Sequence, residues 1–185
     1  MKKYSFRIGL MIVVLLLATI MFYDNKDKSE EFLVRNDLQD MSVEEIVASL
    51  EDKRDEPIGF QAGITSTKLL LSDEEDTVEI DLPKDQFYLS VAPYINQTHP
   101  CGIHNLVTCQ GELANVALKV LVTDSTTNEV IVDSEVHTYS NGFAGLWLPK
   151  DRVLTITVTY ESLQSTKQIS TSEDDNTCET TMRLL

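Results

Sequence analysis

The sequence predicts a mainly β protein that has a small N-terminal helical segment and an antiparallel β-sandwich. From Thr77 onward, apolar and polar residues alternate with a period of two, as in strands with one buried face. Short segments of this kind recur about every 8–12 residues between polar turns, which is typical of a sandwich. The expected strands are residues 77–82, 87–92, 114–123, 129–136, 146–148, 154–160 and 165–170.

Two of these segments show the alternation most clearly. Residues 117–123 and 130–133 flank the polar run DSTTN, so we expect a hairpin with one buried face. In the segment 155–160, threonines alternate with Ile156 and Val158, which predicts a half-exposed strand. The pattern of residues 114–169 is similar to that of transthyretin-like sandwich modules. A likeness of pattern predicts fold and not function.

The N-terminal part, residues 1–28, has the features of an export signal or a membrane anchor. A short basic start precedes an apolar run of about sixteen residues that ends at Tyr23, and a charged stretch follows. The run contains no clean cleavage sequence, so we favour an uncleaved anchor over a cleaved signal peptide. Basic residues before the run place the rest of the chain outside the cytoplasm. We therefore expect the protein in the periplasm or on the outer face of the cell membrane.

Residues 29–58 predict a helical segment. Apolar residues recur at helical spacing, and Ser42 with Glu45 forms a capping box, in which the first side chain caps the helix and the second reaches back. Pro57 ends the segment. Such a short amphipathic pair of helices needs a surface to cover its apolar face. It packs either on the following domain or on a second copy, so a homodimer is one expectation.

The remaining residues, 59–185, form the expected β-sandwich domain. Gly59 and Gly63 indicate turns before a strand that starts at Thr67, and Asn141 with Gly142 indicates a tight turn.

The chain is strongly acidic, with a formal net charge of −15. Residues 1–28 hold five of the Lys/Arg and two of the Asp/Glu, so residues 29–185 carry −18. A surface this acidic argues against nucleic-acid binding, which needs a positive field.

Cysteine and histidine residues mark the candidate site. Two of the three cysteines and two of the three histidines lie within eleven residues, and the last cysteine lies near the C-terminus. These residues are His99, Cys101, His104, Cys109 and Cys178. Thiolate and imidazole are the ligands that Cu(I) and Zn(II) prefer. A C-terminal strand that returns to the loop would gather three sulfurs and one or two imidazoles.

The residues alone leave three interpretations of this cluster open. One is a structural disulfide, between Cys101 and Cys109 or between Cys109 and Cys178, which would make the protein a disulfide-stapled cell-surface module. The second is a zinc site, and the third is a copper site. No nucleotide-binding glycine loop, nucleophile elbow or Cys-x-x-Cys motif occurs, so the sequence contains no conventional active site.

Several runs resemble the CueP family of extracytoplasmic bacterial copper-binding proteins. The runs are FYLSVAPY at 87–94, TH at 98–99, CGIH at 101–104, CQGEL at 109–113, NGFAGLWLP at 141–149 and IST at 169–171, followed by Cys178. The resemblance spans roughly residues 32–185 and is strongest from residue 87 onward.

This resemblance implies copper as the metal and Cys101, Cys109, Cys178 and His104 as ligands, with His99 as a further candidate. It also implies assistance in reducing Cu(II) to Cu(I), through thiols, and delivery of copper to a client such as an extracytoplasmic superoxide dismutase. Cu(II) is reduced by thiols while two of them close to a disulfide. Three cysteines can therefore reduce copper and keep one thiol for the product.

Overall fold

The computed structural model describes residues 28–52 and 59–185. The expected signal or anchor lies outside them except for its last residue, and so do residues 53–58 of the helical segment. Among the helices of the described ranges, none is long and apolar enough to cross a membrane.

The chain divides into two compact units, with the boundary in the sequence between Asp40 and Met41. In the first unit, residues 28–35 are helical, and the Arg35 guanidinium lies 5.6 Å from the centre of the Phe32 ring.

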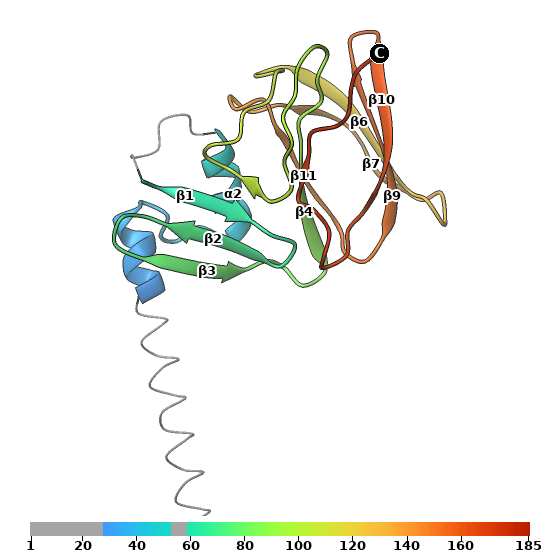
Figure 1. Cartoon of the computed structure of the whole chain (residues 1–185). Helices are drawn as coiled ribbons and strands as arrows, with labels where there is room; N and C mark the ends of the chain where they lie inside the picture. The colour runs from blue at the N-terminus through green and yellow to red at the C-terminus, as the bar shows by residue number, and fades with distance from the viewer. Residues whose placement is uncertain (1–27, 53–58) are drawn as a thin grey trace, which may run out of the picture. The chain divides into compact units, whose positions relative to one another are not determined.

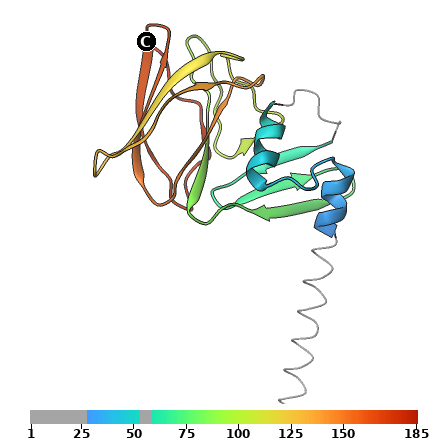
Figure 2. The same cartoon turned by 180° about the vertical axis from the view of Figure 1, so that it is seen from behind.

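Helix α2, Val43–Asp52, begins the second unit at the predicted capping box. The Ser42 amide donates to Glu45 Oε2 at 2.7 Å, and the Glu45 amide donates to Ser42 Oγ at 3.3 Å. The helix lies on one face of a small sheet (Figures 1 and 2), and its apolar side chains, Ile46, Val47 and Leu50, are buried.

That small sheet has the strand order β3-β2-β1-β5, with every pair antiparallel. Its strands are β1 (Gln61–Ile64), β2 (Lys68–Ser72), β3 (Thr77–Asp81) and β5 (His104–Asn105). The turn expected at Gly63 is wrong, because Gly63 lies inside β1 opposite Leu70. Gly59 lies in a turn, with φ +97°.

Two further sheets form the sandwich (Figure 1). One has the order β10-β9-β6-β7 and the other β11-β4-β8. Their strands are β4 (Gln86–Val91), β6 (Ala117–Asp124), β7 (Val130–His137), β8 (Ala144–Pro149), β9 (Val153–Tyr160), β10 (Leu163–Ser170) and β11 (Cys178–Glu179). The alternation predicted all of these strands except β11, and in β6 and β9 every second side chain faces the core between the sheets. Leu118, Val120 and Val122 of β6 meet Phe87, Leu89 and Val91 of β4 there.

The predicted fold class, mainly antiparallel β with a small N-terminal helical segment, is confirmed. The narrower transthyretin-like pattern is not. Among the strands of the described residues, the pairing of β11 with β4 departs from the antiparallel rule, since these two strands run parallel and place Cys178 opposite Ser90. This pairing brings the C-terminal cysteine back to the strand that leads into the cysteine loop.

Candidate metal centre

Three segments that are far apart in sequence meet at the candidate site. Strand β5 pairs with β1, so that His104 lies opposite Ile64. The Thr177 hydroxyl joins the segments, because it accepts a hydrogen bond from the His104 amide at 3.2 Å and donates one to the Ile64 carbonyl at 2.6 Å. The Cys178 amide donates to the Gly102 carbonyl at 3.2 Å. The C-terminal strand therefore packs against the loop that holds Cys101 and Cys109, as predicted from the pattern of cysteines and histidines.

All three sulfurs gather at this point. Cys101 and Cys178 form a disulfide with a Cα–Cα distance of 5.7 Å, and Cys109 keeps a half-buried free thiol. The Cys109 Sγ lies 3.8 Å from the Cys101 Sγ. Neither pairing that the sequence suggested, Cys101–Cys109 or Cys109–Cys178, is the one formed. The reason is topological, because the β11 register and the Gly102 contact place Cys178 beside Cys101.

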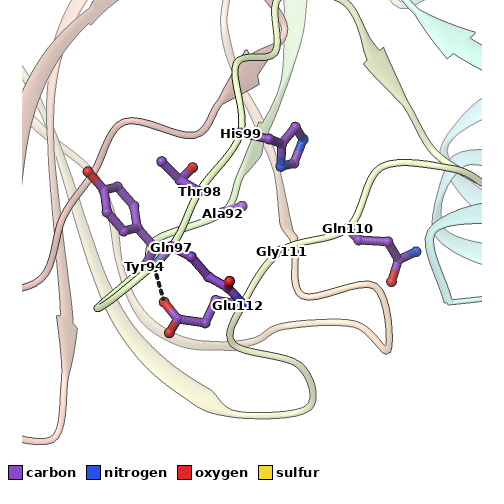
Figure 3. Close-up of a pocket in the computed structure, with 8 residues that line it drawn as sticks. All are labelled: Ala92, Tyr94, Gln97, Thr98, His99, Gln110, Gly111 and Glu112. Carbon is purple, nitrogen blue, oxygen red and sulfur yellow. Dashed lines mark hydrogen bonds between the residues drawn. The ribbon is translucent and has the colours of Figure 1, made fainter.

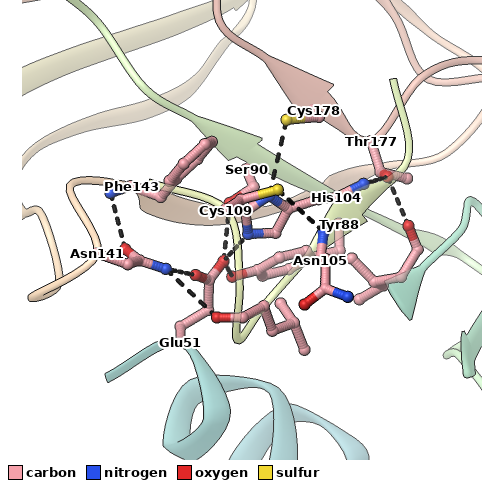
Figure 4. A network of polar contacts seen from close by, with 12 residues as sticks. Glu51, Tyr88, Ser90, His104, Asn105, Cys109, Asn141, Phe143, Thr177 and Cys178 are labelled. Carbon is pink, nitrogen blue, oxygen red and sulfur yellow. Dashed lines mark hydrogen bonds and ion pairs between the residues drawn. The ribbon is translucent and has the colours of Figure 1, made fainter. Parts of the chain in front are cut away.

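The His104 imidazole is fully buried between the sulfurs and a carboxylate (Figure 4). Its Nδ1 lies 3.6 Å from the Cys178 Sγ, and its Nε2 lies 3.0 Å from Glu51 Oε1. The second contact is an ion pair rather than an aligned hydrogen bond, because Nε2 has no hydrogen-bond partner of good geometry. The Phe143 ring covers the imidazole, with ring centres 4.4 Å apart.

The contact between His104 and Cys109 shifts the pKa values of both groups, upward for His104 and downward for Cys109. Burial alone lowers the pKa of His104, but its contacts with the Cys109 thiol and the Glu51 carboxylate outweigh burial and raise the pKa to about 9. Burial raises the pKa of Cys109, yet the contacts with His104 and the Asn105 amide dominate and lower it. This arrangement favours a thiolate at Cys109, and thiolate is the form that binds soft metals.

His99 approaches the sulfurs from the solvent side. It lines a hollow of about 230 Å³ (Figure 3) whose other lining residues are Ala92, Tyr94, Gln97, Thr98, Gln110, Gly111 and Glu112. The ligand atoms of His99, Cys101 and Cys109 lie within 4.8 Å of one another, and so do those of Cys101, His104 and Cys178. The five predicted residues thus form two triads that share Cys101, one half-exposed and one largely buried.

Glu51, which the sequence did not single out, is fully buried beside His104. Its Oε1 accepts hydrogen bonds from the Tyr88 hydroxyl at 3.0 Å and the Ser90 hydroxyl at 2.7 Å. Burial and the neighbouring Glu51 charge raise the pKa of Tyr88 well above its ordinary value, so Tyr88 stays a donor. A signal was present in the sequence, because Glu51 follows Val47 by four residues and therefore extends the apolar stripe of the helix.

Asn141 is the second residue with an overlooked role. Its turn is present, with Gly142 at φ +82°, and the Asn141 Oδ1 accepts from the Phe143 amide at 2.9 Å. Its Nδ2 also donates to Glu51 Oε2. A Cβ on Gly142 would lie 2.5 Å from the Gly111 carbonyl oxygen, so both glycines are needed for the turn to cross the cysteine loop. The turn therefore positions both Glu51 and the Phe143 ring.

Comparison with known proteins identifies the family of this chain. A family described as "Periplasmic copper-binding protein CueP" matches residues 45–183. The chain belongs to the CueP family. A solved structure, described as "Crystal Structure of S.CueP", is 42% identical with a TM-score of 0.80, over 85% of this chain and 97% of that chain. A search among curated proteins found no match.

The CueP match includes α2 from residue 45 onward, the cysteine loop and β11, and hence Glu51 together with all five predicted ligands. When the cysteines are reduced, the five predicted ligands offer thiolate sulfur and imidazole nitrogen, which are the soft and borderline donors that suit Cu(I). Zn(II) accepts the same donors, so the donor set does not by itself separate the two metals.

Proposed function

We propose that this chain is an extracytoplasmic copper-binding protein that holds Cu(I) at the cluster of cysteine and histidine side chains. The observation that carries the proposal is the convergence of three sulfurs on the buried His104 imidazole. Membership in a family described as periplasmic and copper-binding supports both the metal and the location. In the reduced protein, Cys101, Cys109, Cys178 and His104 are the ligands.

His99 has a different part in the proposal. It lines the solvent-side hollow and lies near Cys101 and Cys109. We assign it to the first contact with incoming copper, before the metal reaches the buried triad. Loss of His99 should therefore slow copper uptake more than it weakens equilibrium binding.

The proposal includes reduction of Cu(II). Cys101 and Cys178 each give up one electron and one thiol proton as they form the disulfide, and two Cu(II) ions become two Cu(I) ions. The Cys101–Cys178 disulfide, with the Cys109 thiol free beside it, is the pairing that such a step would leave, and it supports the choice of these two cysteines as the electron source. Cys109 and His104 then retain one of the two Cu(I) ions, and the other Cu(I) ion and the two protons leave to solvent.

Binding is tested by anaerobic titration of reduced full-length protein with Cu(I) against a chromogenic chelator. We expect near-stoichiometric binding, weakened in each of the variants Cys101→Ser, Cys109→Ser, Cys178→Ser and His104→Ala. His137→Ala is the matched control, because His137 is exposed at the end of β7. Unchanged affinity in all four ligand variants would refute the proposal.

Reduction is tested by adding Cu(II) to the reduced protein without another reductant. We expect two thiols lost for every two Cu(I) ions formed, with the Cys101–Cys178 peptide pair recovered after proteolysis. Cys178→Ser removes this pair and should form Cu(I) much more slowly. Rapid Cu(I) formation by that variant would contradict the assigned electron source.

A second candidate function is a disulfide-stapled surface module, and the Cys101–Cys178 disulfide favours it. It predicts a disulfide that is permanent in the cell and no metal, whereas the copper proposal predicts three titratable thiols when copper is scarce. Thiol counting on protein trapped with an alkylating reagent separates the two. Delivery to a client such as superoxide dismutase, membrane attachment through the N-terminal segment, and homodimer formation remain expectations of the copper proposal.

A further inference from the structure

The carboxylate of Glu51 has surroundings that a purely structural residue would not need. It is fully buried, and three neutral donors point at it, from Tyr88, Ser90 and Asn141. Among the described residues, the only cationic partner in ion-pair contact with it is His104. Burying a carboxylate is costly unless its contacts offset the cost, and an apolar side chain at this position of α2 would avoid the cost altogether.

These contacts fix the carboxylate in one place. Tyr88 and Ser90 lie on β4, Asn141 lies in the turn before β8, and Glu51 itself ends the buried stripe of α2 (Figure 4). Two donors reach Oε1, which is also the oxygen that contacts His104 Nε2. The position of Oε1 is therefore set by rigid elements before the imidazole meets it.

The fixed carboxylate also determines which imidazole nitrogen faces the sulfurs. With Nε2 at 3.0 Å from Oε1, the other ring nitrogen, Nδ1, faces the Cys178 Sγ at 3.6 Å. A ring flipped by 180° would turn a carbon atom toward the carboxylate and remove its ion-pair contact with the imidazole. A carboxylate that holds the second nitrogen of a metal-binding histidine fixes the ring and raises its basicity as a ligand.

We propose that Glu51 is a positioning residue of the copper site, which keeps the proton on His104 Nε2 so that Nδ1 is the atom that binds Cu(I). This inference rests on the proposed function. It adds to that function a residue that does not touch the metal and a choice of ligand atom.

The test is a double-mutant cycle on Cu(I) affinity in reduced full-length protein. Glu51→Gln should weaken binding about 10–100-fold, the usual loss for a residue that orients a metal ligand. In the His104→Ala background the same substitution should have no further effect, because Glu51 acts through His104. Glu44→Gln, the same change on the first turn of α2, is the matched control and should leave the affinity unchanged.

A purely structural role would instead weaken binding equally in both backgrounds, and that result overturns the inference. So does unchanged affinity of folded Glu51→Gln protein. If His104→Ala alone leaves the affinity unchanged, then the proposed ligand set fails, which is a distinguishable outcome. If Glu51→Gln does not fold, Tyr88→Phe takes its place, because it removes one donor to Glu51 and keeps the ring. Its effect on Cu(I) affinity should likewise disappear in the His104→Ala background.

A second readout reports the ligand atom directly. Long-range ¹H–¹⁵N spectra of the Cu(I)-loaded protein should show His104 with copper on Nδ1 and a proton on Nε2. Glu51→Gln should lose this single arrangement, seen as weakened or doubled signals. Copper bound to Nε2 in the wild-type protein would overturn the proposal.

Discussion

Loss of the Cys101–Cys178 disulfide should destabilise the protein by an amount that follows from its place in the chain. The two cysteines are 77 residues apart. In the chain-entropy description, a cross-link that closes a loop of this length lowers the entropy of the unfolded chain enough to contribute about 4.5 kcal/mol at 25 °C. For a protein of this size, that corresponds to a fall in Tm of about 9–18 °C.

The assay is urea unfolding of metal-free, full-length protein, followed by circular dichroism. Oxidised wild-type protein should lose about 4.5 kcal/mol of unfolding free energy when a thiol reductant is added. Cys178→Ser should be equally unstable with and without reductant, because it cannot form the disulfide. Cys109→Ser is the matched control and should respond to reductant as the wild type does, since Cys109 is outside the disulfide.

Insensitivity of Cys109→Ser to reductant would mean that Cys109 takes part in the cross-link, and the pairing would be wrong. A wild-type loss below about 1 kcal/mol would instead mean that the unfolded chain is held together by other contacts, so that the entropy argument does not apply.

Four further substitutions test the fold around the site. Burial raises the pKa of Glu112, but hydrogen bonds from the Asn96 amide and side chain, and from the Ile95 and Gln97 amides, outweigh it and lower the pKa to about 2. Glu112→Gln should therefore lower the unfolding free energy by about 1–2 kcal/mol at pH 7, allowing for partial exposure. This contribution is complete above the unfolded pKa of 4.5 and is lost as the pH falls toward 2, so a difference that stays constant down to pH 2 contradicts it. Gly145→Ala would place a Cβ 1.9 Å from the Tyr88 hydroxyl and should cost about 1–3 kcal/mol in urea unfolding, whereas Gly63→Ala, with no neighbour closer than 4.0 Å, should change stability by less than about 1 kcal/mol. Equal effects of the two glycine substitutions would refute the packing argument. Ser42→Ala should cost about 1 kcal/mol by removing the helix cap, and no loss in thermal unfolding would mean that the cap is unimportant.

Strands and helix ends of this protein were predictable because their signals are local. The alternation at 154–158 follows from one buried face, and Leu154, Ile156 and Val158 are indeed buried. The capping box at Ser42 is formed as predicted. Two-residue strands such as β5 and β11 are too short for periodicity to detect, and Gly63 was mistaken for a turn residue because strands seldom contain glycine.

The composition of the candidate site was predictable, but its connections were not. The family resemblance and the chemistry of sulfur and imidazole pointed to the five residues that the structure brings together. Cysteine spacing does not determine disulfide pairing, which here depends on the parallel register of β11 against β4. Glu51 escaped notice because a carboxylate on an amphipathic helix is normally exposed. Only the tertiary structure shows the three donors and the imidazole around it.

We expect copper to bind through the clustered sulfurs and His104. X-ray absorption at the copper edge, on reduced full-length protein loaded with one Cu(I), reports these ligands. The spectrum should show a coordination shell dominated by sulfur with one imidazole, and the imidazole contribution should be lost in His104→Ala but not in His137→Ala. A shell of nitrogen and oxygen alone, or one unchanged in His104→Ala, would contradict this expectation.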